Sequence, residues 1–156
     1  MAARRDDMAA GTRDDGAMTQ DAMISLLTAA TRIACRQLTP QHLNALGASV
    51  ERASGLSARH DWERKVTAHA ELFIMLGDVT GDRDLARLVS SAAERLQDLV
   101  MTVGPAADGM ILSSRRRLLR ELSARDADGA AREVERHLAG LHYMGRVARR
   151  VSAVRA

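Results

Sequence analysis

The sequence predicts an all-α fold, an antiparallel bundle of about six helices, and three observations support this. Apolar residues make up 46% of the 156 residues, which is enough for one globular domain with a sizeable core. Aromatic residues make up only 2%, which disfavours a sheet, because strands are usually rich in aromatic and β-branched side chains. Apolar residues also recur at the three- and four-residue spacing of a helix face, with short connections between the helical segments.

The first 19 residues differ in composition from the rest of the chain. They are small, polar and punctuated by glycine, and they contain the near-repeat ARRDDMA and TRDDGAM. This composition is typical of a flexible leader or linker. We therefore expect residues 1–19 to precede a single helical domain at residues 20–156.

The first two predicted helices are separated by a clear start signal. The first spans about residues 20–37 and the second about residues 40–54. Thr39 can cap the second helix, and Pro40 suits its first position. The residues expected to face the core are Met23, Leu27, Ala30 and Ala34 in the first helix, and Leu43, Leu46, Val50 and Ala53 in the second.

The third and fourth predicted helices differ in the polarity of their inner faces. The third spans about residues 58–76 and ends at Gly77, and a loop at residues 78–84 leads to the fourth, at about residues 84–102. The inner face of the third helix includes a histidine and consists of Trp62, Val66, His69, Phe73 and Leu76. The inner face of the fourth is apolar throughout and consists of Leu85, Val89, Ala92, Leu96, Leu99 and Val103.

The fifth and sixth predicted helices each place one ionisable residue within an apolar face. The fifth spans about residues 108–125, and the sixth begins near Asp126 or Asp128 and continues to about residue 152. The inner face of the fifth consists of Ile111, Arg115, Leu118 and Leu122. The inner face of the sixth consists of Ala130, Val134, His137, Leu141, Met144, Ala148 and Val151.

Three ionisable side chains are thus expected to point inward from three helices: His69, Arg115 and His137. A buried charge costs several kcal/mol unless it is paired, so we predict that they share one polar cavity inside the bundle. Two alternatives remain open. Each histidine could bond a backbone carbonyl, and Arg115 could form an ion pair with Glu94, Glu121 or Glu133.

The charges near these residues favour an anion pocket over a metal site. Lys65 lies one turn before His69, and both Lys65 and Arg115 would repel a divalent cation. The same cations would attract a carboxylate or phosphate, and arginine can bind such a group with two hydrogen bonds. We therefore expect no metal and no cofactor.

Two other functions remain as alternatives. One is a metalloprotein in which His69 and His137 recruit a further ligand, such as His60, His142 or an acid, because divalent ions usually take three or four protein ligands. The other is an interaction module without a small ligand. In that case the arginine row near the C-terminus could contact an acidic partner or the DNA backbone, or simply be a solvated helix end. This row consists of Arg146, Arg149, Arg150 and Arg155.

Several functional classes lack their sequence signatures. The chain contains no glycine-rich phosphate loop, CxxC, HExxH or GxSxG motif, so we expect no enzymatic activity. It contains a single cysteine, Cys35, which excludes an intramolecular disulfide and fits a reducing cytoplasm. No apolar run approaches the roughly 18–20 residues of a membrane span. The net charge of +3 is compatible with an anionic ligand or nucleic acid but demonstrates neither.

Several motifs together resemble one known family. Gly77-Asp78 follows His69 after eight residues, and His137 lies eleven residues after Asp126 within LLRELSARDADGAAREVERHL. With the segment LTPQHLNALGASVERA, this pattern is similar to the FCD domain, the effector-binding domain of GntR-family transcription regulators. The resemblance covers about residues 20–150. It departs from the family at two positions, where Lys65 replaces an aspartate and Arg115 replaces a histidine.

The resemblance implies a function and a set of site residues. It implies a homodimerising, ligand-sensing domain of the FadR or VanR type that binds a small carboxylate or acyl metabolite. The expected effector-binding residues are Lys65, His69, Phe73, Arg115 and His137. Metal-binding members hold zinc or nickel at four positions, of which only the histidines His69 and His137 remain here. DNA would be bound through a preceding winged helix-turn-helix, for which we expect no room in the first 19 residues.

Overall fold

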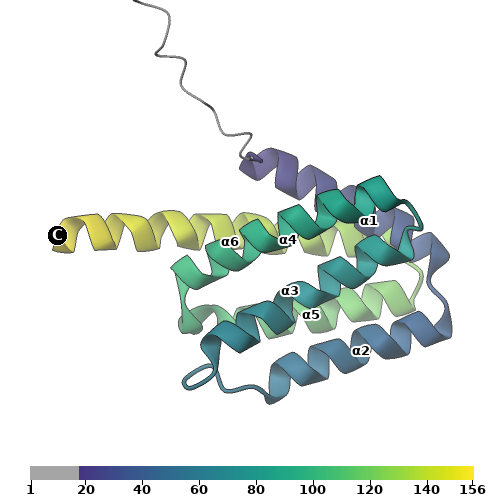
Figure 1. Ribbon diagram of the computed structural model, residues 1–156, viewed down its shortest axis with the longest axis horizontal. Helices are drawn as coiled ribbons and strands as arrows, with labels where there is room; N and C mark the ends of the chain where they lie inside the picture. The colour runs from purple at the N-terminus through teal and green to yellow at the C-terminus, as the bar shows by residue number, and fades with distance from the viewer. Residues whose placement is uncertain (1–17) are drawn as a thin grey trace, which may run out of the picture.

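The computed structural model describes residues 18–156, and this part of the chain folds into six α-helices and one short 3-10 turn (Figure 1). The helices are α1 (Gln20–Gln37), α2 (Pro40–Gly55), α3 (Trp62–Val79), α4 (Arg83–Val103), α5 (Asp108–Ser123) and α6 (Ala127–Arg155), and the turn η1 (Pro105–Ala107) precedes α5. No strand occurs in residues 18–156. The prediction of an all-α bundle is confirmed. Most of the expected leader, residues 1–17, lies outside the described residues.

Side-chain caps fix the starts of several helices. The Thr19 hydroxyl accepts a hydrogen bond from the Ala22 N–H at 3.1 Å and begins α1. At α2, the His42 N–H donates to the Thr39 hydroxyl at 3.1 Å, and the Thr39 N–H donates to His42 Nδ1 at 3.2 Å. This reciprocal pair satisfies backbone donors that a helix start otherwise leaves free, which is why the boundary at Pro40 could be predicted.

The bounds of the third helix were predicted incorrectly at both ends. It begins at Trp62 instead of Ala58, because the Ser57 hydroxyl accepts from the N–H groups of Arg59 and His60 and holds these residues in a turn. It also continues past Gly77 to Val79. A Cβ atom at Gly77 would lie 3.0 Å from Val89 side-chain atoms of α4. Glycine here therefore permits close helix packing and does not end the helix.

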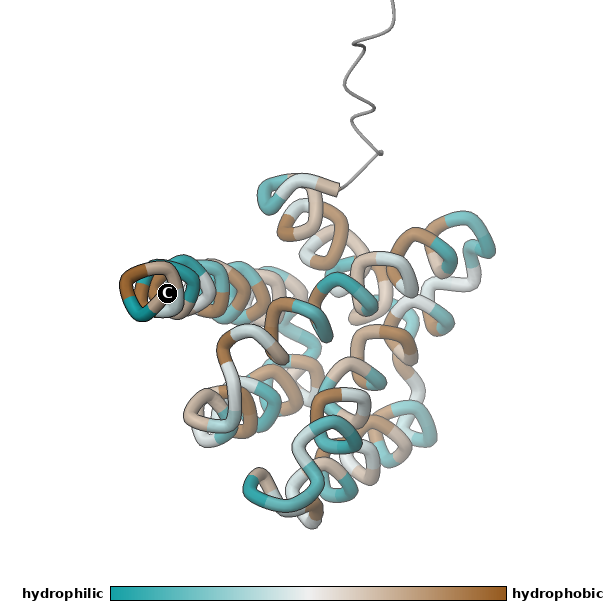
Figure 2. The backbone as a smooth tube through the Cα atoms, turned by 60° about the vertical axis from the view of Figure 1, so that its left-hand side comes forward, coloured by the Kyte–Doolittle hydropathy of each residue, from teal (hydrophilic) through white to brown (hydrophobic). Residues whose placement is uncertain are grey.

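The six helices enclose one apolar core. Helix α6 packs along α1, α4 and α5, while α3 packs against α2, α4 and α1. Apolar and hydrophilic segments alternate along the helices (Figure 2), as expected for helices with one buried face. The largest fully buried side chains include Phe73, Leu27, Leu46, Leu72, Leu76, Leu96, Ile111, Leu118, Leu122, Leu138 and Leu141. None of the helices within residues 18–156 has the length and apolar character needed to cross a bilayer.

The C-terminal part of α6 extends past the ends of the other helices (Figure 1). The last buried residue of α6 is Gly145, where an added Cβ would lie 2.6 Å from the Leu99 Cδ1 of α4. Beyond this contact the predicted inner face is no longer covered, and Val151 is 45% exposed. The expectation that Val151 faces the core is therefore wrong, because the described helices do not reach that far.

Candidate functional site

All five residues expected to form the effector site are buried in the bundle. Their exposed fractions are 2% for Lys65, 2% for His69, 1% for Phe73, 2% for Arg115 and 5% for His137. Lys65, His69 and Phe73 lie four residues apart on α3 and therefore share one face of that helix. Arg115 comes from α5 and His137 from α6, so three helices contribute to the same interior region.

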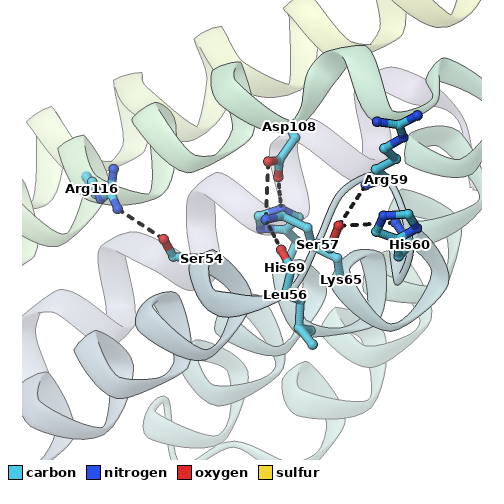
Figure 3. A network of polar contacts seen from close by, with 9 residues as sticks. All are labelled: Ser54, Leu56, Ser57, Arg59, His60, Lys65, His69, Asp108 and Arg116. Atoms are coloured by element: carbon cyan, nitrogen blue, oxygen red, sulfur yellow. Dashed lines mark hydrogen bonds and ion pairs between the residues drawn. The ribbon is translucent and has the colours of Figure 1, made fainter.

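A buried ion cluster joins α3 to the start of α5 (Figure 3). The Lys65 Nζ lies 3.2 Å from Asp108 Oδ2, and the His69 Nε2 lies 3.1 Å from Asp108 Oδ1. Lys65 also donates to the Leu56 carbonyl oxygen at 2.7 Å, just after α2. Asp108 is the first residue of α5, and its side chain is only 18% exposed. The carboxylate therefore partners both α3 side chains and connects three parts of the bundle.

The carboxylate determines which nitrogen of His69 carries the proton. Burial, followed by the nearby positive charge of Arg115, lowers the pKa of His69 from 6.5 to about 4, so the ring is neutral near pH 7. An ionised carboxylate can only accept hydrogen bonds, so the neutral ring donates from Nε2. Its Nδ1 is then an acceptor. This atom is buried and has no hydrogen-bond partner among the described residues.

Arg115 lies in the interior and has no carboxylate partner among residues 18–156. Its Nε donates to the His69 carbonyl oxygen at 3.2 Å, and its guanidinium lies 4.6 Å from the Phe73 ring centroid, in a cation–π arrangement. Burial lowers the pKa of Arg115 from 12.5 to about 10, although the charge of Glu133 opposes this effect. No carboxylate oxygen of residues 18–156 lies within 4.0 Å of the Arg115 guanidinium nitrogens.

Glu133, the acidic group whose charge acts on Arg115, is already engaged by other arginines. Glu133 pairs with Arg117 at 3.2 Å and also with Arg136. Burial raises the pKa of Glu133, but hydrogen bonds from Arg136, Ser114 and Arg117 outweigh this effect and hold the pKa below its ordinary value. The alternative of a direct ion pair between Arg115 and Glu94, Glu121 or Glu133 is thus not observed, and the positive charge of Arg115 is only partly balanced.

His137 is the least satisfied polar side chain of the group. Both of its ring nitrogens are buried and have no hydrogen-bond partner in the described part of the chain. Burial, together with the charges of Arg115 and His69, holds its pKa well below the ordinary value of 6.5. His137 is therefore neutral at pH 7 and close enough to Arg115 and His69 to be affected by their charges. The alternative that each histidine bonds a backbone carbonyl is not observed.

The family of the chain follows from comparison with known proteins. The model of the FCD domain matches residues 20–140. The chain belongs to the FCD family. Neither a curated protein nor a solved structure matches it. The family and the helical bundle inferred from the sequence are confirmed, and the FCD domain is the effector-binding part of GntR-family regulators, a regulatory role and typically not an enzymatic one.

The residues of this FCD domain do not assemble a metal site in the described region. Within residues 18–156, no three His, Cys, Asp or Glu side chains lie close enough together to hold a metal ion. His60 is exposed and belongs to the turn before α3, while His142 bonds the Leu138 carbonyl oxygen at 2.8 Å. The Asp108 carboxylate that contacts His69 also pairs with the Lys65 ammonium, whose charge would oppose a cation.

A surface groove lies outside the buried ion cluster. It has a volume of about 830 Å³ and is lined by residues of α2, α3 and α4, including Arg52, Arg64, Glu71 and Ile74. Its lining includes Leu56, whose carbonyl accepts from Lys65. None of the five expected effector-binding residues lines this groove, so it is separate from the interior group around Arg115.

Sequence reasoning missed Asp108 as a member of the site. It was expected only to begin the fifth helix, and it lies 39 residues from His69 along the chain. One signal could have identified it. Lys65 was expected beside the inward-facing His69, and a lysine at that depth needs a carboxylate. Asp108, at the start of another helix, was one of the acids that could supply it.

Proposed function

We propose that this FCD domain senses a small anionic metabolite, a carboxylate or an acyl compound, that binds inside the bundle. Arg115 would bind the negative group, His69 and His137 would hydrogen-bond it, and Lys65 and Phe73 would hold the surrounding side chains in place. The observation that carries the proposal is Arg115 itself, a buried guanidinium without an ion-pair partner among residues 18–156. A bound carboxylate would supply the missing negative charge.

The unsatisfied histidine nitrogens give a ligand a way to change the bundle. The buried Nδ1 of His69 and both ring nitrogens of His137 lack partners and have almost no accessible surface. Each unsatisfied buried polar group costs about 1–3 kcal/mol. A ligand that bonds them would remove this cost, but only after the helices separate enough to admit it. Such a ligand binds the open arrangement better than the closed one, which is the requirement for a ligand-driven shift.

In an intact regulator this shift would change the positions of the DNA-binding domains. We propose that the domain acts as a homodimer in the cytoplasm and that DNA is bound only through a winged helix-turn-helix domain, which residues 18–156 do not contain. A metal-dependent version of the site is not proposed, because no observation on the described residues favours it.

The test is replacement of Arg115 by a neutral side chain of similar length. We expect Arg115→Met to keep the melting temperature the same or raise it, because replacing an unpaired buried charge with an apolar group is neutral or favourable. The same change should weaken ligand binding by about 10- to 100-fold, since a charge-assisted bond to a buried group contributes about 1.5–3 kcal/mol. Small mono- and dicarboxylates and acyl-CoAs would be screened by thermal shift, and positive compounds measured by calorimetry.

A matched control is available on the same helix. Arg120 is exposed, so Arg120→Met should leave binding unchanged. Arg115→Ala is a second version of the test, which removes the packing on Phe73 as well as the charge. The proposal fails if compounds that bind the unmodified chain bind Arg115→Met equally well while the variant remains folded.

A further inference from the structure

The part of α6 beyond the bundle has its own surface, which we call the α6 overhang and define as residues 143–155. Its exposed apolar side chains are Tyr143 at 62%, Val147 at 42%, Val151 at 45% and Val154 at 87%. Figure 1 shows this segment running past the other helices toward the C-terminus. A helix of this length presents about 18 Å of surface. Exposed apolar side chains gathered on one face of a helix indicate an interaction site.

The spacing of the valines matches the seam of a coiled coil. Val147, Val151 and Val154 are separated by four and three residues, which is the a and d spacing of a heptad. Val151 and Val154 also line a shallow groove of about 240 Å³ with Arg150 and Arg155. β-Branched residues at such positions pack well against a second helix. The face is therefore shaped for a helix lying along it.

The charges beside this seam are all positive. With Val151 at position a and Val154 at d, Arg150 occupies a g position and Arg155 an e position, which are the positions that decide pairing in coiled coils. Arg146 and Arg149 add further positive charge, and the sequence contains no acidic residue after Glu135. The valine seam is thus bordered by arginines with no carboxylate on the same segment.

These charges select against a second copy of the same segment. In a parallel pair, Arg150 of one chain would face Arg155 of the other, and in an antiparallel pair each arginine would face its own counterpart. Like charges at these positions destabilise pairing and act as a specificity device. A bilayer is also a poor fit, because interfacial helices use large residues such as Trp, Phe and Leu. Duplex DNA would use the arginines but leave the valines uncovered.

We propose that the α6 overhang docks an acidic amphipathic helix of a partner protein. The partner helix would place apolar residues against Val147, Val151 and Val154, and glutamates or aspartates against Arg150 and Arg155. This surface lies outside the buried group around Arg115, so its role does not depend on the proposed ligand. It also leaves the proposed homodimer to use another face of the domain.

The experiment uses two synthetic heptad peptides of about three heptads that share leucine at a and d and differ only at e and g. One carries glutamate at these positions and the other carries lysine, so two copies of the same peptide repel each other. We expect the full chain to bind the glutamate peptide at least about tenfold more tightly than the lysine peptide, measured by fluorescence anisotropy. Val151→Asp should abolish the binding, and the double variant Arg150→Glu, Arg155→Glu should reverse the preference.

Leu88→Asp on α4 is the control. Leu88 is also an exposed apolar residue, at 50%, but it lies outside the α6 overhang, so its replacement should leave peptide binding unchanged. Circular dichroism would verify that each variant keeps its helix content. The proposal is overturned if neither peptide binds or if both bind equally. It is also overturned if Val151→Asp abolishes self-association in sedimentation, or binding to phosphatidylserine vesicles or duplex DNA, without affecting the glutamate peptide.

Discussion

Lys65 and Arg115 are buried cations of the same bundle, and their surroundings differ. Lys65 is held by the Asp108 carboxylate and the Leu56 carbonyl, so its charge is paired and two of its three N–H donors have partners. Arg115 has one bond to the His69 carbonyl and lies over the Phe73 ring, and no carboxylate oxygen of residues 18–156 lies within 4.0 Å of its guanidinium. The comparison separates a buried charge that is paired with a carboxylate from one that is not, which is the difference on which the proposed role of Arg115 depends.

Removing the Asp108 carboxylate, which pairs with Lys65, is the strongest test of this comparison. We expect Asp108→Ala to lower the free energy of unfolding by about 3–5 kcal/mol, because it leaves the Lys65 ammonium buried without a counterion. Chemical denaturation would measure the change. The double variant Lys65→Met, Asp108→Ala should recover most of the loss, since it removes both charges.

An exposed ion pair provides the control for this substitution. Asp128 pairs with Arg32 at 3.0 Å, but its side chain is 72% exposed. Asp128→Ala should change the free energy of unfolding by about 0.5 kcal/mol or less. If Asp108→Ala costs no more than Asp128→Ala, the cluster at the start of α5 contributes no more than a surface pair.

Acid should destabilise the bundle through its buried neutral histidines. Unfolded His69 takes up a proton below its ordinary pKa of 6.5, whereas the native ring, buried and close to Arg115, does so only near pH 4. The unfolded state therefore binds more protons between these values, and the free energy of unfolding falls as the pH drops from 6.5 to 4. His69 alone should account for about 2 kcal/mol of loss at pH 5.

Urea denaturation between pH 7 and pH 5 would measure this slope. His69→Gln keeps an N–H donor for Asp108 but cannot titrate, so its profile should be flatter than that of the unmodified chain. His137 contributes in the same direction, because burial and the charges of Arg115 and His69 lower its pKa as well. An unchanged slope in His69→Gln would mean that His69 does not contribute to the acid sensitivity.

The smallest expected effect concerns His137, whose ring nitrogens have no hydrogen-bond partner among residues 18–156. We expect His137→Leu to leave the free energy of unfolding unchanged or raise it by about 1 kcal/mol, because it removes buried nitrogens that lack partners. His142→Leu is the matched comparison on α6 and should lower the free energy by about 1 kcal/mol, since it removes a bond to the Leu138 carbonyl. Thermal and chemical denaturation of both variants would show whether their signs differ.

The bundle was predictable because its signals are local. Thr39 and Pro40 announce the start of α2, and the Asp126 side chain caps α6 by accepting from the Gly129 N–H at 2.8 Å. The apolar spacing also placed His69, Arg115 and His137 in the interior correctly. Each of these inferences depends on residues within a few turns of one another.

The remaining features depend on contacts between distant parts of the chain. The role of Gly77 follows from Val89 on the next helix, and the role of Asp108 follows from Lys65 and His69 on α3. The partners of Arg115 were also unpredictable, because spacing on a helix does not reveal that Glu133 is occupied by Arg117 and Arg136. Local periodicity predicts whether a side chain points into the bundle, but it does not predict which residues of other helices contact that side chain.

The tight contact at Gly145 has a mechanical consequence. Because Gly145 lies directly against Leu99 of α4, this contact is the point about which a rigid α6 would tilt. Val154 lies about 14 Å further along the axis, so a tilt of about 10° at the pivot would carry it by about 2 Å. His137 lies about 12 Å from Gly145 on the other side of the pivot, so a sideways shift of His137 inside the bundle would move Val154 by a similar distance in the opposite direction.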